Sequence, residues 1–178
     1  MPRQTGLERV KEFGPARPYV DPSLRNPKLY KRVLRQFEAA GLVEYRLRCE
    51  APVGLFFVYK KDGSLRVILD GRCASHHFDA PPVVELATGS SFAQISVDSD
   101  GPISLAGVDI VNAFYCIQAP SWLRGYFGLP RVRAGQMGVE HTVCGTAVDP
   151  GAWVVPCFRA MPMGGSFSLW MRRPSWRS

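Results

Sequence analysis

The chain has 178 residues, of which 46% are hydrophobic and 21% charged, and a formal net charge of +7. This composition is typical of a folded globular domain and excludes a largely disordered protein. No apolar run approaches the roughly 20 residues of a membrane span, and the N-terminus lacks the apolar stretch of a secretory signal, so we expect an intracellular chain without a membrane partner.

The basic charge is confined to the first part of the chain. Residues 1–72 hold 15 Lys or Arg against 8 Asp or Glu, whereas residues 73–178 hold 7 of each. A one-sided basic excess suits a region that binds nucleic-acid phosphates. A solvated basic arm without a partner explains the same excess equally well.

The first elements along the chain are an arm and a helix. Residues 1–25 contain scattered prolines and no lasting apolar period, which predicts an extended arm. Asn26 then suits an N-cap, Pro27 the first helical position and Gly41 the helix end. Between them apolar residues recur at three- and four-residue steps, as in an amphipathic helix: Leu29, Tyr30, Val33, Leu34, Phe37 and Ala40.

Residues 54–72 predict a β-hairpin. Two β-rich runs flank Asp62-Gly63, which is a strong signal for a two-residue turn. With that turn, Tyr59 faces Arg66 and Val58 faces Val67. The hairpin tip then carries three basic residues, namely Lys60, Lys61 and Arg66.

The remaining elements are shorter. A helical stretch near Val83–Leu86 is closed by Gly89-Ser90-Ser91, and the mixed stretch 134–151 reads as a long loop or an insertion. The other predicted elements are a buried strand, a helical turn, two further strands and an apolar helix: Ile103–Ile110, Asn112–Ile117, Tyr126–Val132, Trp153–Phe158 and Ser166–Met171.

Three segments, in order, resemble motifs of reverse transcriptases. Lys60–Arg72 is similar to the fingers hairpin of these polymerases, and Val108–Tyr115 to the palm motif that holds the first catalytic aspartate. Met161–Ser166 is similar to the Leu-Pro-x-Gly segment that leads into the next palm helix. The order and spacing of the three make the resemblance more specific than any one motif alone.

The resemblance implies an α+β fold with reverse-transcriptase-like fingers and a partial palm. A β-hairpin and an incomplete antiparallel sheet would pack on helices. The implied division is an arm (1–25), a fingers-like region (26–102), a partial palm (103–171) and an aberrant tail (172–178). The implied partners are an RNA template, a DNA primer and deoxynucleoside triphosphates.

The resemblance also assigns roles to residues of the palm. Asp109 would be the catalytic carboxylate and would bind Mg²⁺ together with the backbone carbonyl of Ile110, since Mg²⁺ prefers oxygen ligands. Phe114 would lie under the sugar of the incoming nucleotide and exclude a 2′-hydroxyl. Gly164 would let the backbone approach the nucleotide closely. A strand-end or helix-capping aspartate and a core aromatic are the ordinary alternatives for Asp109 and Phe114.

The resemblance assigns roles to residues of the hairpin as well. Lys60 and Arg66 match basic residues that hold the triphosphate, for which an ammonium point charge and a planar guanidinium are both suited. Asp70 and Arg72 match positions near the templating base and the template backbone. The alternative for each of these residues is a solvated hairpin face.

Two departures from the family pattern limit these expectations. Met163 stands where retroviral members have glutamine, which resembles some eukaryotic retroelements instead. After Asp109 the only carboxylates are Glu140 and Asp149, and no Tyr-x-Asp-Asp motif follows. We therefore expect a truncated reverse transcriptase with weak or absent Mg²⁺ binding and no activity alone. A non-catalytic nucleic-acid-binding remnant and a decayed reading frame are the alternatives.

Overall fold

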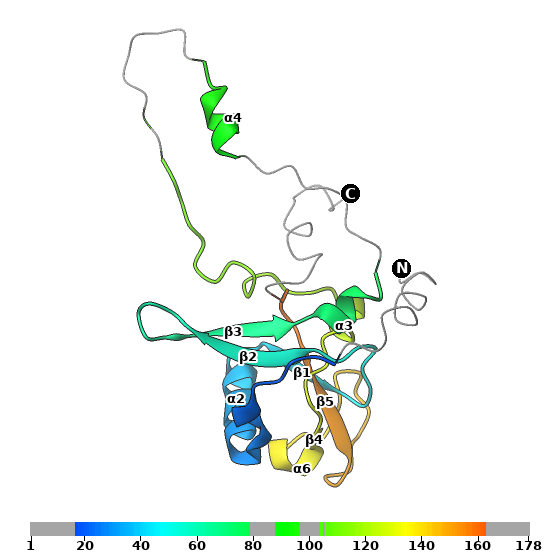
Figure 1. Ribbon diagram of the computed structural model, residues 1–178. Helices are drawn as coiled ribbons and strands as arrows, with labels where there is room; N and C mark the ends of the chain where they lie inside the picture. Colours follow the sequence, from blue (N-terminus) through cyan, green and yellow to red (C-terminus); the bar gives the residue numbers. More distant parts are fainter. Residues whose placement is uncertain (1–16, 79–87, 97–103, 105, 163–178) are drawn as a thin grey trace.

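A computed structural model describes residues 17–78, 88–96, 104 and 106–162 of the chain. This part has an α+β fold with two small antiparallel sheets, as expected (Figure 1). Strands β1 (Val43–Arg46), β5 (Trp153–Phe158) and β4 (Val132–Arg133) form one sheet with β5 in the centre. Strands β2 (Gly54–Tyr59) and β3 (Leu65–Asp70) form a hairpin.

The helices are mostly short. They are η1 (Pro22–Arg25, a 3-10 helix), α2 (Pro27–Ala39), α3 (Arg72–Ser75), α4 (Gly89–Ala93), α5 (Ser121–Arg124) and α6 (Ala134–Met137). Within the described ranges, none of them has the length and apolar character needed to cross a membrane.

Helix α2 forms where the sequence predicts it. The side chain of Asn26 accepts hydrogen bonds from the backbone N–H groups of Lys28 and Leu29, at 3.0 and 3.4 Å, so it satisfies donors that the first turn leaves without a partner. Gly41 follows the helix with a φ of +67°, the left-handed conformation that glycine adopts without strain. The apolar stripe of α2 packs against the three-stranded sheet, where Phe37 meets Phe158 edge to face.

The sheet and α2 enclose the core. Leu34, Leu55, Val154 and Phe158 are completely buried or nearly so, and Met161 closes the same core beyond β5. The hydroxyl of Tyr30 donates to the carbonyl of Pro130 at 2.7 Å and links α2 to the segment before β4. Figure 1 shows α2 and β5 lying below the hairpin.

The start of the central strand β5 carries a partly exposed aromatic residue close to two cations. Trp153 is opposite Arg133 in the β4–β5 pairing and is 42% exposed. The guanidinium carbons of Arg133 and Arg131 lie 4.1 and 4.9 Å from the centroid of its ring, which is close enough for cation–π attraction.

The residues before α2 are tied to the hairpin. Residues 22–25, which the sequence led us to place in an extended arm, form η1, and Leu24 is buried. The backbone N–H of Asp21 donates to the carbonyl of Leu55 at 2.8 Å. Gly54 permits this approach, because a Cβ there would lie 1.9 Å from the carbonyl oxygen of Tyr19.

The hairpin forms as predicted, but the predicted register is wrong by one residue. Tyr59 pairs with Leu65 and Val58 with Arg66. Lys60 N donates to the Ser64 carbonyl at 2.8 Å, so the loop has three residues, 61–63, in place of two. Gly63, with a φ of +79°, occupies the left-handed position of this three-residue loop.

The predicted buried strand Ile103–Ile110 is wrong for the residues that the structure describes. Ser104 and residues 106–110 have no regular secondary structure, and Val108 is 94% exposed. An apolar run forms a stable strand only against a partner, and within the described part of the chain no strand pairs with it. Residues 111–116 form turns in place of the predicted helix, with Asn112 at a φ of +53°.

Other predicted elements hold only in part. Of Tyr126–Val132, only a bridge at Gly128 and the first residue of β4 pair with neighbours. Gly89 begins α4, at a position where the sequence predicted the end of a helix, and Thr88 and Ser91 form the capping box of α4. The loop 134–151 contains α6 and a bridge between His141 and Ala147. The predicted helices at 83–86 and 166–171 lie outside the described residues.

Candidate nucleic-acid interface

The turn of the hairpin holds two lysines at an exposed tip. The carboxylate of Asp62 accepts hydrogen bonds from the backbone N–H and the hydroxyl of Ser64, at 2.9 and 2.6 Å, and these bonds lower its pKa. The loop is therefore fixed from inside, although its residues are exposed. Lys60 and Lys61 lie at its start and project their charge from the end of the hairpin.

The observed register places Lys60 and Arg66 on one face of the hairpin. Lys60 is opposite Ser64, and Arg66 is opposite Val58, so the two basic side chains are diagonal neighbours. In the predicted register they would have faced opposite sides, because successive side chains alternate. Both residues line a cavity of about 360 Å³ beside the hairpin.

The segment that follows Asp109 forms another wall of the same cavity. Asn112 and Tyr115 line it together with Lys60 and Arg66. The hydroxyl of Tyr115 donates a hydrogen bond to the backbone carbonyl of Val67, and its ring packs edge to face on Phe158. Tyr115 is thus half-buried. Two of the three segments that carry the family resemblance therefore lie side by side.

The residues expected to bind metal and sugar do not line this cavity. Asp109 and Ile110 are exposed on the irregular segment, and Phe114 is half-buried one residue before Tyr115. In the described part of the chain, no group of three or more His, Cys, Asp or Glu side chains could hold a metal ion. A single exposed carboxylate does not fit a two-metal Mg²⁺ site, which depends on clustered oxygens. Gly164 lies outside the described residues.

Asp70 and Arg72 lie at the other end of the hairpin and bind each other. Arg72 donates to Asp70 through Nε and Nη2, at 2.8 and 2.6 Å, and the backbone N–H of Tyr19 donates at 2.8 Å. The Arg72 guanidinium and the other donors hold the pKa of the Asp70 carboxyl down at about 2. Both residues line a second cavity, of about 490 Å³, bounded by Tyr19, Phe56 and His76 among others. Asp70, which was expected to lie near the templating base, therefore connects the hairpin to Tyr19 and Arg72 through hydrogen bonds.

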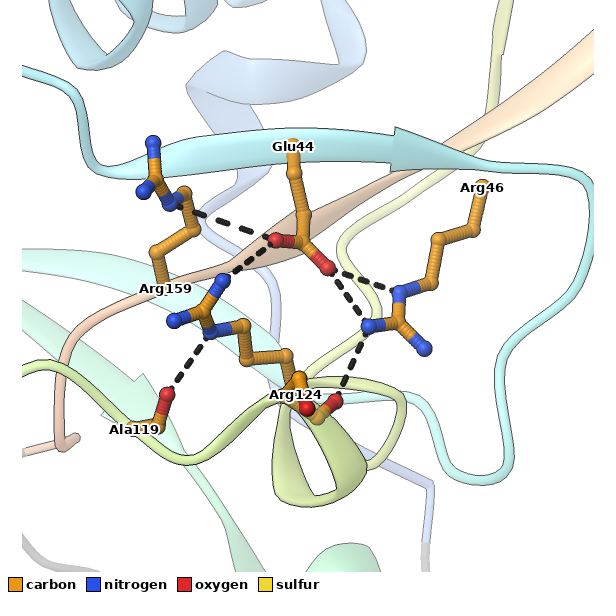
Figure 2. Close-up of polar contacts among 6 residues, drawn as sticks. Glu44, Arg46, Ala119, Arg124 and Arg159 are labelled. Atoms are coloured by element: carbon orange, nitrogen blue, oxygen red, sulfur yellow. Dashed lines mark hydrogen bonds and ion pairs between the residues drawn. The ribbon is translucent and has the colours of Figure 1, made fainter. Parts of the chain in front are cut away.

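A buried carboxylate surrounded by three arginines lies on the three-stranded sheet (Figure 2). Glu44 in β1 accepts two contacts from Arg46, Nε at 2.8 Å and Nη2 at 2.6 Å, on one oxygen. Its other oxygen accepts from Arg124 Nη1 at 2.9 Å, and Arg159 Nε lies 3.9 Å from it. We call these four residues the arginine cluster. Arg124 also donates to the Ala119 carbonyl, and Arg46 to that of Ser121, so the cluster joins β1, α5 and the end of β5.

Sequence reasoning missed the arginine cluster, because Arg124 and Arg159 are far from Glu44 and Arg46 in the chain and meet them only in the fold. The one available hint is Glu44 itself, since an acidic residue within an apolar strand needs buried partners. The contact between Tyr115 and Val67 could not be predicted from the sequence either, because it joins residues 48 positions apart.

The chain was compared with protein-family models, with curated proteins and with solved structures, and no match was found in any of the three comparisons.

Proposed function

We propose that this chain is a reverse-transcriptase-like fingers and palm region of a eukaryotic retroelement, and that it binds single-stranded nucleic acid through the tip of the β2–β3 hairpin. The observation that carries the proposal is the shared cavity of Lys60, Arg66 and the segment Asn112–Tyr115. These are parts of two motifs that are separate in sequence and adjacent in the fold. An RNA template and a DNA primer are the partners that this reading implies.

The chemistry of the tip supports phosphate binding. Lys60, Lys61 and Arg66 lie around one end of the hairpin, where they border a shallow cavity of about 480 Å³. The carboxylate of Asp62, which lies beside them, already accepts two hydrogen bonds from Ser64. Phosphates that approach this end meet the exposed Lys61 and Arg66 and the half-buried Lys60. Counterion release then drives binding.

A non-catalytic nucleic-acid binder is the form of this function that we favour for the chain acting alone. The specific observation is the position of Asp109, exposed on an irregular segment without a cluster of acidic residues among the described side chains. Phosphoryl transfer depends on a cluster of positioned charges, which one exposed carboxylate does not supply. Binding of nucleic acid by the hairpin does not depend on a cluster of carboxylates.

The test is the salt dependence of binding to a single-stranded RNA of about 20 nucleotides, followed by fluorescence anisotropy. We expect the double variant Lys60→Ala/Arg66→Ala to bind more weakly than the parent at low salt. Its plot of log affinity against log salt should be less steep by about 1.4, since each phosphate contact to a single strand contributes about 0.7.

The matched control is Lys28→Ala/Arg32→Ala, which removes the same charge from the exposed face of α2. It should change affinity less and keep the slope close to that of the parent. If both double variants lose affinity equally, binding follows net charge and the hairpin is not the site. If the parent shows no salt-dependent binding at all, the proposed function is wrong.

A further inference from the structure

The arginine cluster holds more positive charge than its acidic residue balances. Three guanidinium groups surround one carboxylate, which leaves an excess charge of +2. Among the described residues, Glu44 is the only carboxylate that forms an ion pair with Arg46, Arg124 or Arg159. The carboxylate itself is 6% exposed, while the three arginine side chains are 24%, 15% and 33% exposed. The carboxylate is therefore inside, and the arginines extend from it toward solvent.

The unused hydrogen-bonding capacity lies mainly on Arg159. Its Nε is buried and has no hydrogen-bond partner within the described part of the chain, because Glu44 lies 3.9 Å away and its oxygens already accept from Arg46 and Arg124. Figure 2 shows the outer nitrogens of Arg159 pointing away from Glu44. Arg46 faces a different environment, since Glu50 lies near it across Gly125. The excess charge is thus least compensated on the side of Arg124 and Arg159.

We propose that the Arg124–Arg159 side of the arginine cluster is a binding site for a phosphate dianion, either the free ion or a terminal phosphate monoester. A terminal phosphate carries a charge of about −1.5 to −2 at neutral pH, which matches the excess of the cluster better than the single charge of a phosphodiester. Guanidinium forks bind phosphate oxygens in pairs, and Glu44 holds the arginines in place before a ligand arrives. The source of the group is free phosphate or the phosphorylated end of a nucleic acid.

The site is separate from the hairpin. Glu44 pairs with Cys157 in the sheet, whereas the neighbouring residue Phe158 packs on α2 and lines the hairpin cavity. Because successive side chains of a strand point to opposite faces, the cluster and the hairpin cavity lie on opposite faces of the sheet. Binding of free phosphate at this site does not depend on the proposed function. Binding of the phosphorylated end of a nucleic acid rests on the proposed function.

The first test is thermal unfolding of the full chain in sodium phosphate, against sodium chloride of the same ionic strength at pH 7.5. We expect a saturable rise in the melting temperature that is specific to phosphate, as for any ligand that binds only the folded state. Arg159→Gln should weaken the apparent affinity about tenfold, which is the effect of one charge-assisted hydrogen bond. We choose Arg159 because Glu44 keeps both of its closer partners in this variant. The matched control, Arg131→Gln, should respond like the parent.

The second test compares one oligonucleotide with and without a 5′-phosphate. A preference of the parent for the phosphorylated form, lost in Arg159→Gln, would identify the nucleic-acid end as the source. Stabilisation by free phosphate without that preference would identify the free ion. If phosphate gives no specific stabilisation, or stabilises Arg159→Gln as much as the parent, the proposal is wrong. The phosphate titration tests the phosphate site even if the hairpin binds no nucleic acid.

Discussion

Asp70 connects three parts of the chain through one carboxylate. It ends β3, it accepts two hydrogen bonds from the Arg72 side chain at the start of α3, and it accepts the backbone N–H of Tyr19 before η1. Its side chain is 8% exposed, whereas that of Arg72 is 66% exposed. Arg72 and the distant Tyr19 thus satisfy the buried carboxylate oxygens, while the guanidinium group of Arg72 remains in contact with water.

Asp70→Asn should therefore lower the stability of the fold in a pH-dependent way. The folded-state pKa of about 2 is below the ordinary value of 3.8, so the ionised group stabilises the fold above about pH 4 and loses this effect as the pH falls toward 2. We expect a loss of about 1 to 2 kcal/mol at pH 7, reduced from the full shift because Arg72 is exposed. Urea unfolding at pH 7 and pH 3 measures it.

The comparison with Asp62→Asn controls for the loss of one charge. Asp62 is exposed and bonds only within its own loop, so its replacement should cost less at pH 7. A difference between parent and Asp70→Asn that is the same at both pH values would contradict the role assigned to the carboxylate.

At the scale of elements, the hairpin loop depends on one glycine in a left-handed conformation. Gly63→Ala should destabilise the fold by about 1 kcal/mol, because an L-residue with a φ near +79° is strained. Steric collision does not contribute, since no atom lies within 4 Å of the added Cβ. Denaturant unfolding of the variant gives the difference.

Gly71→Ala is the matched control for this measurement. Gly71 has the same open surroundings but a φ of −89°, which alanine adopts readily. It should be neutral or slightly stabilising, because alanine reduces the freedom of the unfolded chain. Equal losses in both variants would show that the sign of φ is not the cause.

The elements that could be predicted from sequence are those with local signals. Asn26, Pro27 and Gly41 fix the bounds of α2 through bonds within a few residues, and the prediction there is confirmed. The hairpin register failed because Gly63 suits both a two-residue and a three-residue loop. The strand at 103–110 failed because an apolar run does not specify its partner.

The candidate site shows the same limit. The charges of Lys60 and Arg66 could be placed at the tip from sequence, yet a one-residue error in register put them on opposite faces. The arginine cluster depends on contacts between residues up to 115 positions apart (Glu44 and Arg159), and such contacts follow only from the packing of the sheet. The roles of Asp109, Ile110 and Phe114 stay predictions.

At the scale of the whole molecule, we predict no primer extension by this chain on its own. Asp109 is the one carboxylate that the resemblance places at the metal site, and it is exposed on an irregular segment. Two-metal transfer needs further oxygen ligands on the same surface, so the reaction lacks its main source of charge stabilisation. The measurement is extension of a DNA primer on an RNA template with Mg²⁺ or Mn²⁺.

An Asp109→Asn protein accompanies this assay. Incorporation by the parent that disappears in Asp109→Asn would overturn the prediction and would assign Asp109 a catalytic role. Incorporation that persists in Asp109→Asn would indicate a contaminating polymerase.

The pair of cations beside Trp153 makes this residue an optical probe of the assembled sheet. Its ring is partly open to water, and Arg131 and Arg133 give its surroundings a positive potential. Iodide, an anion, should therefore quench its fluorescence more than caesium does, and a Trp153→Phe protein isolates its share of the emission. When β4 separates from β5, the guanidinium groups move away from the ring and the preference for iodide over caesium falls. Their ratio thus follows the pairing of β4 with β5 during unfolding.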